Sequence, residues 1–257
     1  MLRFKNLGSG SSGNATVVQA GSAGALTHLL IDCGLGVRQL DQRLGQAGML
    51  AEQIDAIFIT HEHGDHIGCA RQLALRERIP VWMSHGTYVG IGEPDFDGLL
   101  RIAADAQPVA MGALEITPFT VPHDAREPLQ LTCSDGATRL GILTDLGHAT
   151  THVLQQLSGC ATLLLECNHD PQLLAASTYP PFLKRRVGGA WGHLANSAAA
   201  AIAQALAPHG LRQVVAAHLS EQNNRPELAR AALAQVLGAA TEIHVADGRS
   251  GSRWLSA

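Results

Sequence analysis

His61-Glu-His-Gly-Asp-His66 is the stretch of sequence that decides the fold. It follows the apolar run Ile57-Phe-Ile-Thr60, which predicts a buried strand, and it precedes a segment with helical periodicity. Two histidines two residues apart at a strand end can point at one metal ion. An aspartate and a histidine at the turn into the helix can reach a second ion. Imidazole and carboxylate suit zinc, manganese or iron(II), so the stretch predicts a metal centre rather than a polar loop.

Three later polar residues also follow apolar segments. They are His123 in Val121-Pro-His-Asp124, Asp145 in Leu143-Thr-Asp-Leu-Gly147 and His218 in Ala217-His-Leu-Ser220. Taken alone, each is a weak signal, because a histidine beside a proline is often only a loop residue. Their order along the chain, each at the end of a strand, makes the signal strong.

Short apolar runs alternate with longer amphipathic ones along the whole chain. We predict strands at 16–20, 28–31, 56–59, 81–83, 114–119, 129–132, 139–143, 162–165, 213–216 and 242–245. We predict helices at 36–46, 67–78, 148–156, 171–176, 197–207 and 226–237. No linker rich in glycine, serine or proline interrupts this pattern, so residues 1–257 are expected to form one domain.

A weak internal repeat relates two parts of the chain. Segments 27–34 and 139–147 each form an apolar strand that ends on an aspartate, with a glycine two residues later. The next strand of each part ends on polar residues, Thr60-His61 in one and Glu166 in the other. Polar strand ends in two similar halves indicate one shared site. Two β-rich halves with helices outside predict an α/β fold, a four-layer αββα sandwich.

Composition sets limits on partners and location. Hydrophobic residues make up 46% and charged residues 16%, which excludes disorder, and the net charge of −4 excludes a general nucleic-acid-binding coat. No apolar run approaches a membrane span, and we see no signal peptide, so we expect no membrane partner. The five cysteines form no Cys-x-x-Cys pair. Reduced, mostly buried thiols in a cytoplasmic protein are the simplest explanation.

The motif His-x-His-x-Asp-His after a strand is similar to the signature of the metallo-β-lactamase superfamily, and the three later residues match its further ligands in order. The resemblance implies a fold of this type with two divalent metal ions, zinc or manganese, with iron also possible. The implied ligands are His61, His63, Asp65, His66, His123, Asp145 and His218, with the carboxylate of Asp145 shared by both ions. Asp32 is expected to orient a ligand rather than to bind metal.

Five further motifs narrow the resemblance to the YycJ/WalJ-type branch. They are Gly8-Ser-Gly-Ser-Ser-Gly-Asn14, Thr144-Asp-Leu-Gly147, Leu165-Glu-Cys-Asn-His-Asp170, Trp191-Gly-His-Leu-Ala-Asn196 and His218-Leu-Ser-Glu-Gln-Asn-Asn224. The branch implies a 5′→3′ DNA exonuclease, in which a hydroxide held between both metals attacks a phosphodiester. His148 and Cys167 depart from the expected aromatic and serine, which puts substrate preference in doubt but leaves the ligands intact.

Two other functions remain open. The same fold also serves hydrolases of small esters, thioesters or cyclic phosphodiesters. A metal-bound binding module without activity is a different class, although the complete ligand set argues against it. A secreted β-lactamase is disfavoured because no signal peptide is seen. The sequence leaves the oligomeric state open.

The resemblance also implies a catalytic pair. In ribonuclease Z, which this chain resembles, a glutamate and a histidine act together on the leaving-group oxygen. Glu166 and His193 occur here in the same order. A departing alkoxide needs a proton, and a carboxylate can hold the imidazole that supplies it. A buried structural hydrogen bond is the alternative. Asp65 is expected to orient the attacking hydroxide as well as to bind metal.

Substrate contacts are expected from two further parts of the chain. In the loop Gly8–Asn14, the amides together with Ser11, Ser12 and Asn14 are expected to bind a phosphate oxygen, or else the loop is only a flexible turn. His169 is expected near the site because Glu166 is.

The run Lys184-Arg185-Arg186 is the best candidate for contacts with backbone phosphates in this acidic protein. We expect Lys184 and Arg185 to make them. A solvated surface run is the alternative.

Overall fold

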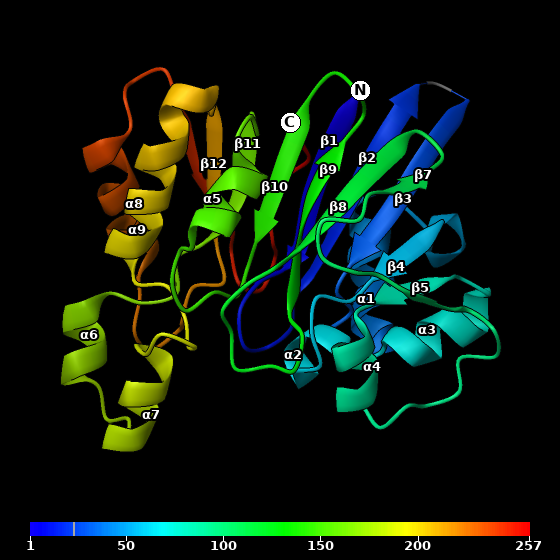
Figure 1. The fold of residues 1–257 in the computed structure, drawn as a ribbon, viewed down its shortest axis with the longest axis horizontal. Helices are drawn as coiled ribbons and strands as arrows, with labels where there is room; N and C mark the ends of the chain where they lie inside the picture. Colours follow the sequence, from blue (N-terminus) through cyan, green and yellow to red (C-terminus); the bar gives the residue numbers. More distant parts are fainter. Residues whose placement is uncertain (23) are drawn as a thin grey trace.

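The computed structural model describes residues 1–22 and 24–257. Their strands form two mixed seven-stranded sheets, ordered β14-β1-β2-β3-β4-β5-β6 and β13-β12-β11-β10-β9-β8-β7 (Figure 1). The first sheet contains β1 (Leu2–Gly8), β2 (Ala15–Ser22), β3 (Ala25–Ile31), β4 (Ala56–Phe58), β5 (Val81–Met83), β6 (Leu100–Ile102) and β14 (Leu255–Ser256). The second contains β7 (Val109–Met111), β8 (Leu114–Thr120), β9 (Leu129–Ser134), β10 (Arg139–Leu143), β11 (Thr162–Glu166), β12 (Gln213–Ala217) and β13 (Glu242–Val245).

The helices lie outside the two sheets (Figure 1). They are α1 (Val37–Gln46), α2 (Gly64–Ile67), α3 (Ala70–Glu77), α4 (His85–Gly90), α5 (Thr151–Leu157), α6 (Pro171–Ala176), α7 (Pro181–Val187), α8 (Asn196–Leu206) and α9 (Pro226–Val236). None of the helices in residues 1–22 and 24–257 is long and apolar enough to cross a lipid bilayer.

Three buried apolar layers confirm the four-layer αββα sandwich. One lies between the two sheets and includes Phe4 of the first sheet and Leu131 of the second. A second lies between the second sheet and α5, α8 and α9, and a third lies between the first sheet and α1 and α3. Strand β11 shows the cause, because alternate side chains point to opposite faces of a sheet. Leu164 belongs to the inner layer, whereas Leu163 and Leu165 belong to the helix-covered one.

The internal repeat predicted from the sequence is present in the topology. Strands β1, β2 and β3 pair antiparallel, and β3 to β6 continue in parallel. Strands β8, β9 and β10 pair antiparallel, and β10 to β13 continue in parallel. Strand β3 therefore corresponds to β10 and β4 to β11. The polar ends of these four strands meet at the lower edge in Figure 1, near α2, whereas both chain termini are at the opposite edge.

The predicted helix 67–78 corresponds to α3 and begins three residues later than expected. Helix α2 ends at Ile67 and α3 begins at Ala70. Gly68 between them has a φ of +26°, and a Cβ there would lie 2.3 Å from the carbonyl oxygen of Cys33. The close approach of the chain after β3 therefore separates α2 from α3, a tertiary cause that helical periodicity does not reveal.

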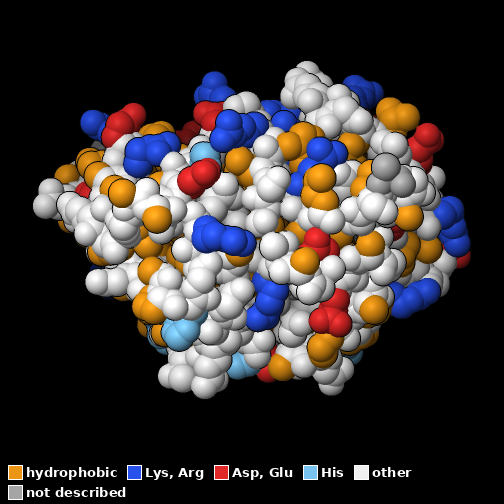
Figure 2. All heavy atoms as spheres, turned by 90° about the horizontal axis from the view of Figure 1, so that it is seen from above, with side chains coloured by type: hydrophobic (Ala, Val, Ile, Leu, Met, Phe, Trp, Pro, Cys, Tyr) orange, Lys and Arg blue, Asp and Glu red, His pale blue; other side chains and the backbone are white. Residues whose placement is uncertain are grey.

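Basic side chains are not gathered on the face that bears the termini. Figure 2 views the molecule from that side, and its Lys and Arg side chains are scattered among acidic and apolar ones. No continuous basic surface is therefore visible among the described residues of this face.

Candidate metal centre

Two equivalent Asp-x-Gly turns build the floor of the site. Asp32 follows β3 and Asp145 follows β10, each with a glycine two residues later. A Cβ on Gly34 would lie 1.7 Å from the carbonyl oxygen of Asp65, and one on Gly147 would lie 2.0 Å from that of Ala190. Only glycine permits these approaches. The repeated glycine therefore lets the turn after β3 pack against Asp65 and the turn after β10 pack against Ala190.

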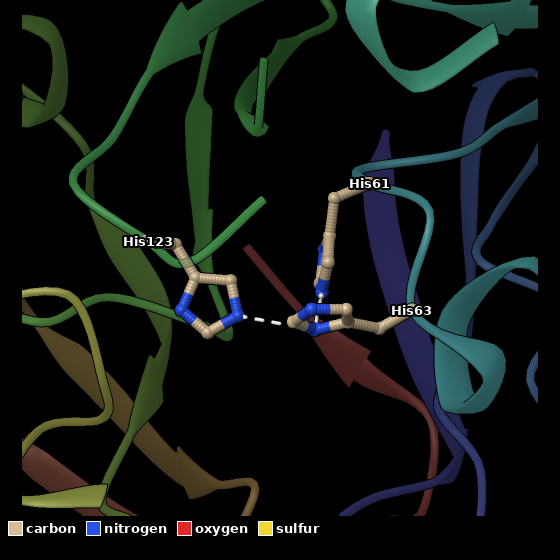
Figure 3. Close-up of side chains that lie close together, drawn as sticks. All are labelled: His61, His63 and His123. Carbon is tan, nitrogen blue, oxygen red and sulfur yellow. Dashed lines mark hydrogen bonds between the residues drawn. The ribbon is translucent and has the colours of Figure 1, made fainter. Parts of the chain in front are cut away.

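The first group of candidate ligands is His61, His63 and His123. One ring nitrogen of each lies within 4.8 Å of the others. Figure 3 shows the three rings facing one another, with Nδ1 of His63 3.0 Å from Nε2 of His61 and 3.3 Å from Nε2 of His123. Three nitrogens that converge from the β4–α2 turn and from the end of β8 match the facing ligands of a metal ion.

The second group is Asp65, His66 and His218. Oδ2 of Asp65 lies 3.7 Å from Nε2 of His66 and 3.7 Å from Nε2 of His218. His218 follows β12 with a φ of +53°, a conformation that is costly for a residue with a side chain. Its backbone amide donates a hydrogen bond to Oγ of Ser9, at 2.6 Å. This contact with the Gly/Ser loop helps to hold the strained backbone in place.

Asp145 lies between the two groups. Its Oδ2 is 3.0 Å from Nε2 of His66, and its Oδ1 is 3.9 Å from Nε2 of His123. Oδ2 of Asp145 and Nε2 of His218 are buried, and among the described residues neither has a partner with hydrogen-bond geometry. Buried polar atoms without a partner are costly, and a cation among them would satisfy both. The donor set of imidazoles and carboxylates therefore fits two divalent ions that share Asp145.

Contacts behind the imidazoles fix the ring nitrogens that face the centre. In each case Nδ1 lies against an oxygen, which leaves Nε2 for the centre. The partners are Thr60 Oγ1 for His61 at 3.0 Å, Asp32 Oδ2 for His66 at 2.7 Å, Gly192 O for His123 at 3.0 Å and Thr144 O for His218 at 2.8 Å. The expectation that Asp32 orients a ligand agrees with its position.

The electrostatics differ across the cluster: burial lowers the pKa of His61 and His123, whereas carboxylates favour positive charge on His66 and His218. Burial disfavours a charged His66, but the carboxylates of Asp145 and Asp32 outweigh it and raise the pKa of His66 to about 10. Burial also disfavours a charged His218, but the carboxylate of Asp145 outweighs burial and raises the pKa of His218. Burial opposes ionisation of Asp145, yet His218 and His66 hold the pKa of Asp145 well below its usual range. Carboxylates buried here attract protons or cations, and a divalent ion would replace the protons.

Glu166 and His193 form a pair on the rim of the cluster. Oε1 of Glu166, at the end of β11, lies 2.7 Å from Nδ1 of His193. Oε2 accepts hydrogen bonds from the backbone amides of Leu146 and Leu194, at 2.8 and 3.3 Å. Oδ1 of Asp145 is 3.3 Å from the same Nδ1. Burial by itself would lower the pKa of His193, but the carboxylates of Glu166 and Asp145 outweigh burial and raise this pKa to about 9.

One open cleft reaches members of both groups and of the pair. Its volume is about 370 Å³, and its wall includes His63, Asp65, Asp145, His193 and His218. A second cavity of about 260 Å³ adjoins it. The two share Ser11 and Tyr179 in their walls. The cleft gives an extended substrate access to the cluster.

The comparisons with known proteins agree with this geometry. A family model described as a beta-lactamase superfamily domain matches residues 27–219. The exodeoxyribonuclease YycJ of Bacillus anthracis is 31% identical over 258 residues, which cover 96% of each chain. The chain belongs to the metallo-β-lactamase superfamily.

Within this superfamily the chain belongs to the YycJ-like branch. The exodeoxyribonuclease WalJ of Streptococcus pneumoniae is 28% identical over 244 residues, covering 93% of this chain and 89% of that protein. The crystal structure of the metallo-β-lactamase fold protein YhfI from Bacillus subtilis superposes with a TM-score of 0.77 at 19% identity, with both chains fully covered. This last likeness confirms the fold.

The structure brings together all seven ligands predicted from the metallo-β-lactamase motifs, and it places Glu166 and His193 beside them. Of the residues expected to contact substrate, only some line the cleft. Ser11 lines the cleft, whereas Ser12 lines only the adjoining cavity. His169 is 4% exposed and does not belong to the cleft wall.

Asn14 is also buried, and it supports the site instead of facing substrate. Its Nδ2 donates hydrogen bonds to the carbonyl oxygens of Asp65 and Gly10, each at 3.2 Å. The amide of Gly10 in turn donates to Oδ1 of Asn14, at 2.8 Å. We therefore reassign Asn14 from substrate binding to positioning of the Gly/Ser loop against Asp65.

The basic run also needs correction. Lys184 donates a hydrogen bond to the carbonyl of Ala175, at 2.6 Å, and neither Lys184 nor Arg185 lines the cleft. Arg186 does line it, together with Leu183 and Val187. These three residues share one face of α7, because residues three and four apart lie side by side on a helix. The basic run in the sequence includes Arg186, but only the position of α7 and the direction of its faces show that this residue reaches the cleft.

The contact between Asp32 and His66 can be tested by Asp32→Asn. Asparagine tolerates the φ of +61° at this position, so the backbone should persist. We expect metal affinity to fall by roughly 10- to 100-fold, the usual effect of losing a carboxylate behind a histidine ligand. Titration against a chromogenic chelator measures it.

A matched control is Asp105→Asn, which changes a similar carboxylate–histidine contact, 2.9 Å from His152, on the surface. The control should bind metal like the wild type. Equal affinities in all three proteins would contradict the orienting role of Asp32.

Proposed function

We propose that this chain is a phosphodiesterase with two divalent metal ions that degrades DNA from the 5′ end. One observation carries the proposal. Two groups of candidate metal ligands lie around the buried carboxylate of Asp145, and beside them His193, held by the buried Glu166, lies on the wall of an open cleft. Two metals and an adjacent proton donor are the parts that in-line displacement at phosphorus requires.

The ions would be held by the six residues of the two groups and by Asp145 between them. When bound, they would lower the pKa of the attacking water and neutralise the phosphate. Five imidazoles and two carboxylates suit zinc or manganese, and iron(II) remains compatible with this set.

The residues of the chain would divide the remaining work. Asp65 forms part of the cleft wall and is placed to accept a hydrogen bond from the attacking water. Glu166 and Asp145 both lie on the Nδ1 side of His193, which leaves Nε2 for the substrate. We propose that Nε2 gives a proton to the departing 3′ oxygen. Glu166, fixed by two backbone amides, would hold the ring in position and stabilise its charged form.

The relatives support DNA as the substrate, because two proteins that align over nearly their full length are named exodeoxyribonucleases. We also propose a cytoplasmic location. All five cysteines are buried and free, which suits a reducing compartment.

Degradation of end-labelled DNA tests the proposed function. Protein loaded with manganese or zinc should shorten DNA, single- or double-stranded, stepwise from the 5′ end, and it should process RNA of the same sequence more slowly. Gel analysis of 5′- and 3′-labelled strands separates the two polarities. Protein stripped by a chelator should be inactive until the metal is returned.

Other substrates in the same experiment distinguish the alternatives. Rapid cleavage of a thioester or a cyclic dinucleotide, with every DNA strand left intact, would replace the nuclease by a small-substrate hydrolase. Absence of activity on all substrates, with two metals bound, would favour a binding module.

A further inference from the structure

Arg186 stands out among the residues that the proposed chemistry leaves unused. It lies near the end of α7 and its side chain is 60% exposed. Its Nε donates a hydrogen bond to Oδ2 of Asp124, at 2.6 Å. Among the described residues its guanidinium makes no other hydrogen bond, so the two terminal nitrogens retain their donors for a ligand.

Asp124 connects Arg186 to the metal ligands. It follows His123, and its other oxygen, Oδ1, lies 3.4 Å from Nε2 of His123 and 3.8 Å from Nε2 of His63. A carboxylate at this position repels an anionic substrate unless a cation neutralises it. Arg186 is the cation that does so.

The charges on the cleft wall make this neutralisation necessary. Three carboxylates line it, from Asp65, Asp124 and Asp145, and Arg186 is the one Lys or Arg among the described residues of the wall. Asp65 and Asp145 are expected to face the metals, which leaves Asp124 and Arg186 as the charged pair nearest to incoming substrate.

We propose that Arg186 and Asp124 form a phosphate-binding site above the first group of metal ligands. The terminal nitrogens of Arg186 bind the non-bridging oxygens of a backbone phosphate, and Asp124 holds the guanidinium in place through Nε. This inference rests on the proposed function, since it names the contact that positions the strand. Arginine suits the task better than lysine because its planar group can hold the carboxylate and a phosphate at the same time.

The test measures cleavage and binding in single and double variants. Arg186→Ala should raise KM for DNA by roughly 10- to 100-fold, the effect of losing a charge-assisted hydrogen bond, and should change kcat much less. Binding of a phosphorothioate-protected single strand, followed by fluorescence anisotropy, should lose about 0.7 from the slope of log K against log salt. Arg186→Lys should restore only part of the affinity.

The direction in which Asp124→Asn changes DNA affinity distinguishes this proposal from other roles of the pair. With Arg186 removed, the bare carboxylate repels phosphate, so Arg186→Ala with Asp124→Asn should bind DNA more tightly than Arg186→Ala alone. Asp124→Asn alone should bind at least as tightly as the wild type. Arg78→Ala is the matched control, because Arg78 is similarly exposed and pairs with a carboxylate, Asp97, while neither residue lines the cleft. It should keep the wild-type KM and salt slope.

Three outcomes overturn the proposal, and a second substrate keeps it testable. An unchanged KM and salt slope in Arg186→Ala, or no gain from adding Asp124→Asn, removes the phosphate contact. Loss of metal from Arg186→Ala makes the pair a support of the metal site instead. If the wild type leaves DNA intact, the proposed nuclease function fails. KM for bis(p-nitrophenyl) phosphate and inhibition by inorganic phosphate then decide the role of Arg186 separately.

Discussion

Replacing Asp145 by alanine should weaken both metal sites at once and lower turnover on the order of 10³-fold or more, since the metals supply several kcal/mol of transition-state stabilisation. The carboxylate lies close to Nε2 of His66 in one group and of His123 in the other. The fall in affinity should exceed the roughly 10- to 100-fold expected of a residue behind the ligands. Elemental analysis after dialysis should find fewer than one ion per chain, where the wild type should retain about two.

Stability must be controlled in this experiment. Removing a carboxylate buried among imidazoles leaves charged groups without a partner, which can cost about 3–5 kcal/mol. Asp145→Asn keeps the shape with less disturbance, and circular dichroism reports whether each variant is folded. Asp105→Ala, on the surface, should keep both ions. A folded Asp145 variant that retains one ion at wild-type affinity would show that the carboxylate serves a single site.

The ligand set was predictable because parallel strands deliver their ends to one edge. Each motif residue follows a short apolar run, and strands β4, β10 and β12 place His61, Asp145 and His218 at the same edge of the sandwich. The Asp-x-Gly repeat predicted the equivalence of the two halves. Its physical basis, the crowding around Gly34 and Gly147, became visible only when the chain segments were in contact.

What the sequence did not reveal depends on contacts between distant segments. Helix α7 has seven residues between Pro180 and Gly188, too few for a periodic pattern, so the face that carries Arg186 was not predictable. From the sequence we predicted Asn14 to bind a phosphate oxygen, whereas its side chain is buried. Its burial follows from its hydrogen bonds with Asp65, 51 residues away. The local sequence pattern indicates which residue types form a site, whereas the contacts of each residue depend on how distant segments pack in the fold.

His193→Ala should separate proton donation from metal binding. His193 lies outside the seven proposed ligands, so the variant should keep both ions and the fold. Turnover of DNA should fall by roughly 10²- to 10⁴-fold, the usual contribution of a general acid. Glu166→Gln should show a smaller loss, because the neutral amide still positions the ring but stabilises its charged form less. The double variant should lose less than the product of the two single losses, since the pair acts as a unit.

The leaving group decides whether this loss reflects proton transfer. p-Nitrophenolate departs well without a proton, so the effect of His193→Ala should shrink on bis(p-nitrophenyl) phosphate while it remains large on DNA. Equal losses on both substrates would assign His193 to positioning. Loss of metal would make it a ligand, which its place within 4.8 Å of Asp145 and His218 permits sterically. The Nδ1 contact with Glu166 excludes only that nitrogen as a ligand atom, because a nitrogen held at 2.7 Å by a buried carboxylate is already partnered, so the metal content of His193→Ala decides whether Nε2 binds metal or donates a proton.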